Sequence, residues 1–532
     1  MFLHDMLERA ARLWASAPAV CDGPVRLSYR ELDARVRRLA AALQGLGLRH
    51  GEHIAVIAHN GFRYMEAYLA AALAGLVLAP INTRLNPRET AFILNDGQVR
   101  ALLVGPACLP ILQAMGSELE TVGHAIVLDE ALDDAARAAG AAAPAVALHA
   151  YEALLAAADP ATVRPRDWRE DDLVHLCYTG GTTGRPKGVM LSQRNVVSNI
   201  GHAIQFSEFN DRDVWLHAAP MFHLADSWAC FAMTLLGARH VFMPAFEPRR
   251  ALELIAEERV TASLWVPTMI NAALALRDLA RYDVSSMRRL VYGASPMPPE
   301  RLRAAIALFG NILLQAYGQT ESSPFLTCTS LRTTDPNGSE ADIRRLASCG
   351  QELVGVQVRV VDTDDRPVRP GAVGEIVARG PNVMLGYWQR PQETATALRG
   401  GWLHTGDLAT VDDEQYITIV DRAKDMIISG GENVYSTEVE SALYQHPAVL
   451  EAAVIGVPDE RWGEAVTAIV VLREGRHADA QALIAHCHER IAAYKCPKRI
   501  AFLPALPKSG AGKILKAELR KPYWEGQARR VH

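Results

Sequence analysis

The stretch YTGGTTGRPKGV, residues 178–189, concentrates groups that can bind phosphate oxygens. Glycines leave backbone N–H groups open to a ligand, threonines supply hydroxyl groups, and a lysine supplies a positive charge. The combination predicts a site for a polyphosphate. The residues concerned are Thr179, Gly180, Gly181, Thr182, Thr183, Gly184 and Lys187.

The stretch departs from the two most familiar nucleotide-binding loops. It lacks the pattern GxGxxG, and Gly188 stands where a GxxxxGK[ST] loop has the Ser or Thr that binds magnesium. Taken alone, it is equally consistent with a flexible surface loop, so the rest of the chain must decide.

The segments around this stretch alternate between strand-like and helical patterns over the first 420 or so residues. This alternation predicts an α/β fold with parallel-rich sheets. We interpret the Ala-rich residues 130–160 as a helix–loop–helix excursion; the alternative, which we favour, is a poorly specified surface insertion. Strand-like runs occupy residues 53–59, 76–82, 100–105 and 124–129, and another, DLVHLC, directly precedes the glycine-rich stretch.

The pattern changes toward the C-terminus. Short strands with Pro/Gly turns predict a β-barrel-like subdomain, and the residues after Asp421 read as a small α+β domain on a hinge. We therefore expect a large N-terminal domain over 1–421, which holds the candidate phosphate site, and a mobile C-terminal domain over 422–532.

Composition narrows the class of protein. The chain has 532 residues with a net charge of −5, so nothing in its overall charge favours nucleic acid. Its eight cysteines form no CxxC pair, and its longest apolar run, residues 68–81, is too short to span a bilayer. These features predict a reduced, cytoplasmic protein without a transmembrane segment.

Further stretches dense in glycine, acidic and aromatic residues follow the first one along the chain. They are PMFHLADS (220–227), YGASPMPPE (292–300), QAYGQTES (315–322), GWLHTGDLA (401–409), VDRAKDMIISGGENVYSTEVE (420–440) and PKSGAGKILK (507–516). With YTGGTTGRPKG, these motifs occur in the order found in the adenylate-forming (AMP-binding) superfamily. The chain resembles its acyl-CoA synthetases, and most of all the fatty-acyl and aryl-acyl CoA ligases.

The resemblance implies a two-step reaction that uses ATP, Mg²⁺ and CoA. A carboxylic acid first forms an acyl-adenylate with release of pyrophosphate, and the thiol of CoA then displaces AMP. The resemblance assigns the glycine-rich stretch to the β- and γ-phosphates, although the family often has Ser where this chain has Gly180. Thr179 and Glu321 are the implied magnesium ligands, and Thr320 the implied contact of the α-phosphate.

The resemblance also implies the adenosine site. Tyr317 is the expected face for adenine, Asp407 the ribose anchor, and Arg422 a ribose or phosphate contact. The remaining implied nucleotide-site residues are Gly293, Ala294, Ser295, Gln315, Ala316 and Gly318.

In the small domain, Lys513 resembles the catalytic lysine of adenylation, and Lys424 stands at the implied hinge. The family rotates this domain between the two steps, which brings Gly430 and Gly431 to the pantetheine tunnel. His223 resembles the gate between the nucleotide and acyl pockets. Ser227 is expected on a helix lining the acyl pocket, along with Ala225, Trp228 and Cys230.

Several alternatives remain open at this level. We expect medium- or long-chain fatty acids as substrates; the alternatives are an aryl or arylpropenoic acid, or transfer of the acyl group to a separate carrier protein. A non-enzymatic binding relative is disfavoured because Glu321, Asp407, Arg422 and Lys513 are all present. By analogy with a family whose members are often dimers, a homodimer is an expected state.

Overall fold

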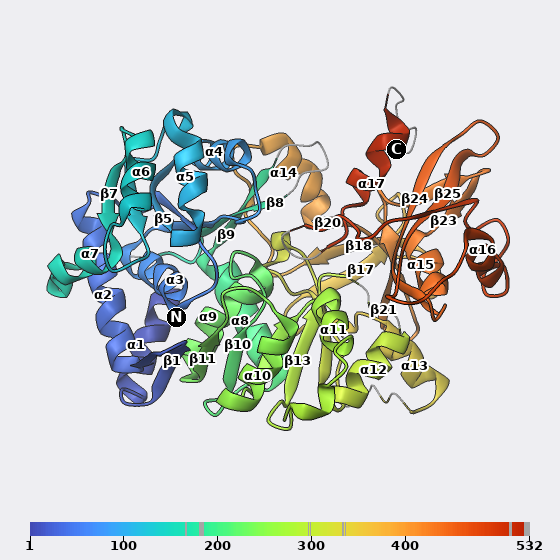
Figure 1. The fold of residues 1–532 in the computed structure, drawn as a ribbon, viewed down its shortest axis with the longest axis horizontal. Coiled ribbons are helices and arrows are strands. Elements are labelled where there is room, and N and C mark those ends of the chain that lie inside the picture. Colours follow the sequence, from blue (N-terminus) through green and yellow to red (C-terminus); the bar gives the residue numbers. More distant parts are fainter. Residues whose placement is uncertain are drawn as a thin grey trace.

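A computed structural model of the chain describes residues 1–164, 168–179, 186–295, 297, 299–331, 335, 337–509 and 513–525. Two large sheets form the bulk of the described chain, and Figure 1 shows them flanked by helices. The order of the first sheet is β16 (Gln351–Glu352), β15 (Thr327–Cys328), β14 (Leu313–Tyr317), β13 (Arg289–Gly293), β12 (Ala262–Trp265), β10 (Val214–His217), β11 (Arg239–Phe242), β1 (Pro18–Asp22) and β2 (Val25–Ser28).

The second large sheet holds the strands next to the glycine-rich stretch. Its order is β19 (Gly386–Tyr387), β9 (Lys187–Ser192), β8 (Leu173–Thr179), β4 (Val77–Pro80), β3 (His53–Ile57), β5 (Val99–Val104), β6 (His124–Val127) and β7 (Ala147–Ala150). Both sheets are parallel at their centres and antiparallel toward an edge. The predicted α/β fold with parallel-rich sheets is confirmed.

Two smaller sheets follow. The predicted β-barrel-like subdomain is an antiparallel sheet of β17 (Gln357–Val361), β18 (Gly374–Arg379), β20 (Leu403–Val411) and β21 (Ile417–Arg422). The C-terminal sheet contains β23 (Glu432–Val434), β22 (Ile427–Ser429), β25 (Gly463–Leu472) and β24 (Val449–Asp459), with β26 (Arg499–Phe502) paired to β25.

The helices cover both faces of the large sheets (Figure 1), and helices also pack on both faces of the C-terminal sheet. In the N-terminal half they are α1 (Leu3–Leu13), α2 (Tyr29–Gly45), α3 (Phe62–Ala74), α4 (Pro87–Asp96), α5 (Leu109–Met115), α6 (Asp134–Ala142), α7 (Tyr151–Ala157), α8 (Gln193–Ser207), α9 (Leu224–Leu236) and α10 (Pro248–Glu258). Those that follow are α11 (Pro267–Leu274), α12 (Pro299–Phe309), α13 (Glu340–Ala347), α14 (Pro391–Ala397), α15 (Ser436–Tyr444), α16 (Ala480–His488) and α17 (Lys516–Trp524). None of the helices in the described part of the chain has the length and apolar character needed to span a bilayer.

One part of the sequence interpretation was wrong. Residues 130–160 form α6, β7 and α7, so the expected loop between the helices contains a strand, Ala147–Ala150, which pairs with β6. The segment is also anchored in the core, because Tyr151 is fully buried and donates a hydrogen bond to Glu66. Alanine has low strand propensity, and pairing with a neighbouring strand overrides it here.

The hydrophobic core divides along the chain. The two clusters of the large sheets contain buried residues from Leu3 to Ile417, whereas the two clusters of the C-terminal sheet contain residues from Ile427 to Leu519. The gap between these ranges includes residues 421 and 422, where the sequence predicts the domain boundary.

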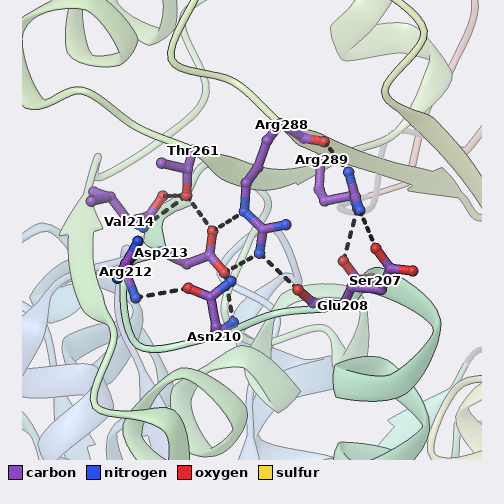
Figure 2. A network of polar contacts seen from close by, with 9 residues as sticks. All are labelled: Ser207, Glu208, Asn210, Arg212, Asp213, Val214, Thr261, Arg288 and Arg289. Atoms are coloured by element: carbon purple, nitrogen blue, oxygen red, sulfur yellow. Dashed lines mark hydrogen bonds and ion pairs between the residues drawn. The ribbon is translucent and has the colours of Figure 1, made fainter.

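A polar network fastens the N-terminal ends of β10, β12 and β13, away from the ends that carry the candidate site (Figure 2). Asp213 is 1% exposed and accepts hydrogen bonds from Thr261 at 2.6 Å and from Nε of Arg288 at 2.6 Å. Arg289 donates to the Ser207 carbonyl at 2.8 Å. Because a buried carboxylate needs such partners, the network fixes where these strands begin.

Candidate functional site

The described ends of the glycine-rich stretch lie opposite each other on two paired strands. Thr179 ends β8 and faces Lys187, which begins β9, in antiparallel register. Both side chains are half-buried. Thr179 and Lys187 are therefore held side by side where this strand pair meets the glycine-rich stretch. Gly180, Gly181, Thr182, Thr183 and Gly184 lie outside the described residues.

Glu321 lies beside this strand pair. It belongs, with Thr320, to a short 3₁₀ helix, Thr320–Ser322, and its side chain is half-buried. The hydroxyl group of Tyr387 donates a hydrogen bond to Oε1 of Glu321 at 2.9 Å. The ammonium of Lys187 lies 5.3 Å from the centre of the Tyr387 ring. One tyrosine thus contacts both the expected metal ligand and the expected phosphate lysine.

Asp407 lies at the centre of a second group of contacts. It is 5% exposed and accepts hydrogen bonds from the Tyr317 hydroxyl at 2.9 Å and from Nε2 of Gln319 at 3.0 Å. Nε of Arg422 lies 3.2 Å from its other oxygen, because β20 and β21 pair Asp407 with Arg422. The structure therefore brings together Tyr317, Asp407 and Arg422, which the sequence assigned to one nucleoside.

The strand ends near Tyr317 approach each other too closely for side chains. A Cβ on Gly293 would lie 2.3 Å from the Ala316 carbonyl, and one on Gly318 would lie 1.7 Å from the Pro324 carbonyl. Ala294, just after β13, adopts a left-handed φ of 69° that favours glycine. Glycine is therefore required at 293 and 318 for the close backbone approach at these strand ends.

The remaining predicted adenosine residues occupy the same strand ends. Gln315 and Ala316 lie on β14, where both are buried, and Gln315 accepts a hydrogen bond from Tyr292 at 3.1 Å. Ser295 follows Ala294 and is half-buried.

Lys513, from the C-terminal part of the chain, lies within the electrostatic field of this site. Burial and the charge of Arg422 lower the pKa of Lys513 to about 8, while the charges of Asp407 and Glu321 act in the opposite direction. Its backbone is held in a turn, since Ser509 N donates to the Lys513 carbonyl at 2.7 Å. Arg84, which precedes α4, donates in turn to the Ser509 carbonyl at 3.2 Å. The C-terminal part is thus seated so that the charges of Glu321 and Asp407 act on Lys513.

His223 lies at the N-terminus of α9, and Ser227 one turn further along. Burial, followed by the charges of Lys513 and Arg84, lowers the pKa of His223 to about 3. The ring is therefore neutral at physiological pH, and among the described residues its buried Nε2 has no hydrogen-bond partner. Ser227 is 1% exposed. His223 thus stands between the Lys513 region and the helix that the sequence assigned to the acyl pocket.

Gly430 and Gly431 form the two-residue turn of the β22–β23 hairpin. Their φ values of 63° and 86° require glycine for such a turn. A Cβ on Gly430 would lie 2.8 Å from the Trp462 ring. Lys424 follows Arg422, and burial, followed by the charge of Arg422, lowers its pKa.

Sequence reasoning missed Tyr387, Gln319 and Arg84 as members of the site. Gln319 is in the motif QAYGQTES, so its place beside Glu321 gave a signal. Tyr387 and Arg84 are outside the quoted motifs. Among the described residues, no group of three or more His, Cys, Asp or Glu side chains could hold a metal ion.

Comparisons with known proteins identify the family of the chain. Residues 7–388 match the family described as AMP-binding enzyme, and residues 438–513 match its C-terminal domain. A feruloyl-CoA synthase of an Amycolatopsis species is 39% identical over 97% of this chain and 98% of its own length. A medium/long-chain-fatty-acid–CoA ligase of Mycobacterium tuberculosis, FadD8, is 32% identical over 99% of this chain and 91% of its own.

A solved structure extends the likeness to the fold. The anthranilate CoA ligase AuaEII, in complex with anthranoyl-AMP, matches with a TM-score of 0.88 at 26% identity, covering 98% of this chain and 97% of that one. The two family matches and these relatives together establish the family of the protein. The chain belongs to the AMP-binding enzymes, the adenylate-forming superfamily, as an ATP-dependent acyl-CoA ligase.

Proposed function

We propose that the chain ligates a compact aromatic or arylpropenoic acid to CoA. The substrate's carboxylate oxygen attacks the α-phosphorus of ATP, the bond from that phosphorus to the bridging oxygen breaks, and pyrophosphate leaves. The sulfur of CoA then attacks the acyl carbon, and AMP leaves. The first step gathers negative charge around the α-phosphate, so a cation held there in a water-poor site lowers its barrier.

Each clustered side chain has a part in the first step. Lys513 neutralises charge on the α-phosphate and the carboxylate, Thr320 contacts the α-phosphate, and Asp407 accepts hydrogen bonds from the ribose hydroxyls. The position of Lys513 next to Glu321 and Asp407 supports this assignment. Thr179, Lys187 and the glycine-rich stretch hold the β- and γ-phosphates.

The residues present fit a magnesium ion. Among the described residues, Glu321 uses only Oε1 in a hydrogen bond, which leaves Oε2 for a ligand, and Mg²⁺ binds few carboxylates besides phosphate oxygens. When bound, Mg²⁺ neutralises charge on the phosphates. Glu321 would hold it, with Thr179 as a second contact.

The second step needs a different placement of the C-terminal domain, over 422–532. In the present arrangement Lys513 is subject to the charges of Asp407 and Glu321, so we infer a rotation about Lys424 that withdraws it for the second step. The same rotation brings the hairpin of Gly430 and Gly431 to the path of the CoA thiol, where the absence of side chains leaves room.

The preference for a compact acid rests on the packing around α9. Trp228 is 2% exposed, and its ring lies 5.0 Å from Trp215 and 5.4 Å from Phe325, centre to centre. We take this aromatic block as the end of the acyl pocket along α9, which would exclude a long alkyl chain. The likeness to feruloyl-CoA synthase and to the anthranilate ligase supports the same class of acid.

The test is pyrophosphate release from ATP over a panel of acids, each with and without CoA. The panel contains benzoate, anthranilate, cinnamate and ferulate, together with octanoate and palmitate. We expect release with the ring acids and consumption of CoA. Faster turnover of palmitate than of any ring acid would refute the proposed substrate class.

A medium- or long-chain fatty acid is the second candidate, and the likeness to FadD8 favours it. Release of pyrophosphate without consumption of CoA would instead indicate a carrier protein as the acyl acceptor. Trp228→Ala separates the first two candidates, because removing the ring should improve turnover of long chains only if the aromatic block limits the pocket.

A further inference from the structure

Tyr387 joins two parts of the candidate site that are far apart in the sequence. Its hydroxyl group contacts Glu321 at 2.9 Å, and its ring lies 5.3 Å below the ammonium of Lys187. Glu321 and Lys187 carry opposite charges and have opposite tasks, one toward a cation and the other toward phosphates. Because Tyr387 is neutral and contacts both side chains, it can separate the two charges and fix the orientation of each side chain.

The position of Tyr387 is fixed by the strand pair itself. Tyr387 pairs with Val189 across β19 and β9, and the Trp388 backbone donates to the Gly188 carbonyl at 2.7 Å. The Met384 backbone donates to the Glu321 carbonyl at 2.9 Å. The segment 384–388 is thus hydrogen-bonded to Glu321 on one side and to the lysine-bearing strand on the other.

Asp96 ties the same segment to the strand that ends in Thr179. Asp96 accepts hydrogen bonds from the Tyr178 hydroxyl at 2.6 Å and from Arg390 at 2.8 Å, and its carbonyl accepts one from the Trp388 indole at 2.9 Å. Tyr178 directly precedes Thr179. The segment around Tyr387 is therefore hydrogen-bonded to the strand that begins with Lys187 and to Glu321, and it is linked through Asp96 to the strand that ends in Thr179.

We propose that Tyr387 is a positioning residue that orients Glu321 toward the divalent metal of metal–ATP and Lys187 toward the phosphates. The inference rests on the proposed role of Glu321 in metal binding. A hydrogen bond to one carboxylate oxygen fixes the rotation of the carboxyl group and leaves the second oxygen for the ion. Loss of such an outer contact lowers metal affinity by about 10- to 100-fold in metal sites.

The experiment measures binding rather than turnover. Mn²⁺ affinity is measured by electron paramagnetic resonance on the enzyme–ATP complex, and ATP affinity is measured separately in EDTA by calorimetry. The variants are Tyr387→Phe, which removes only the hydroxyl group; Tyr387→Leu, which also removes the ring; and Glu321→Gln. Tyr282→Phe is the matched control, since the Tyr282 hydroxyl contacts Arg249 on another surface.

We expect Tyr387→Phe to weaken Mn²⁺ binding about 10- to 100-fold while ATP affinity in EDTA stays within about twofold. Tyr387→Leu should additionally weaken metal-free ATP binding by about two- to fivefold, the scale of one cation–π contact. Thermal melting of each variant shows whether the fold is retained, and Tyr282→Phe should behave like the unaltered protein.

Two results would overturn the inference, and they are distinguishable. If Glu321→Gln loses Mn²⁺ affinity but Tyr387→Phe keeps it, Tyr387 does not orient the carboxylate, and the proposed function stands. If Glu321→Gln itself keeps full Mn²⁺ affinity, the metal assignment within the proposed function is wrong, and the role of Tyr387 falls with it.

Discussion

The lowered pKa of Lys513 makes the first half-reaction sensitive to alkaline pH. Only the protonated ammonium can stabilise the negative charge that gathers in adenylation. Its pKa is lowered from 10.5 to about 8, chiefly by burial and then by Arg422. From that pKa, about nine tenths of the enzyme carries the charge at pH 7 and about one tenth at pH 9, a tenfold loss. A lysine at its ordinary pKa would remain almost fully charged over the same range.

The assay is exchange of labelled pyrophosphate into ATP, which follows adenylation without CoA and its titrating thiol. Because kcat/KM reports groups of the free enzyme, its logarithm should fall with a slope approaching −1 above pH 8. The alkaline decrease in kcat should occur at higher pH than the decrease in kcat/KM, because the bound phosphates of ATP favour the charged form of Lys513.

Lys513→Arg provides the control, because the guanidinium stays protonated throughout this range. The variant should be slower than the unaltered enzyme, yet its alkaline fall should disappear. A profile of the unaltered enzyme that stays flat to pH 9.5, or an unchanged fall in Lys513→Arg, would refute the assignment of this titration to Lys513.

Three further outcomes follow from the site and the fold. Lys513→Ala should abolish pyrophosphate exchange but leave thioester formation from supplied acyl-AMP largely intact; equal loss of both half-reactions, measured separately, would contradict the rotation of the C-terminal domain. Gly318→Ala should lower the free energy of unfolding by about 1–3 kcal/mol, because the new Cβ meets the Pro324 carbonyl; urea denaturation measures this loss, and an unchanged midpoint would count against the close approach. Asp213→Ala should lower the free energy of unfolding by about 3–5 kcal/mol by leaving Arg288 without its buried partner, with little effect on KM for ATP in the folded protein; a changed KM with unchanged stability would mean that the network of Figure 2 acts on the site instead.

Much of the fold could be predicted because its signals are local. The strands at 53–57, 77–80 and 99–104 follow from short apolar runs, and the helix over Leu3–Leu13 from its amphipathic spacing. The strand Ala147–Ala150 could not be predicted, because its alanine-rich sequence carries no strand signal and its stability comes from the edge of β6. The sheet orders are likewise properties of contacts between distant segments.

The candidate site divides in the same way. The resemblance to the superfamily was enough to name Glu321, Asp407, Arg422 and Lys513 as candidates, because each lies in a motif that the superfamily shares. The hydrogen bond from Tyr387 to Glu321 spans 66 residues of sequence, and no local pattern marks it.

The sequence by itself determined which chemical groups the protein has for adenylate chemistry and which glycines leave its backbone open. Only the tertiary structure decided that Lys513 lies beside Glu321 and Asp407 with a lowered pKa, and that Tyr387 stands between Glu321 and Lys187. The physical reason is that desolvation and Coulomb interactions depend on distances and burial, which chain order does not contain.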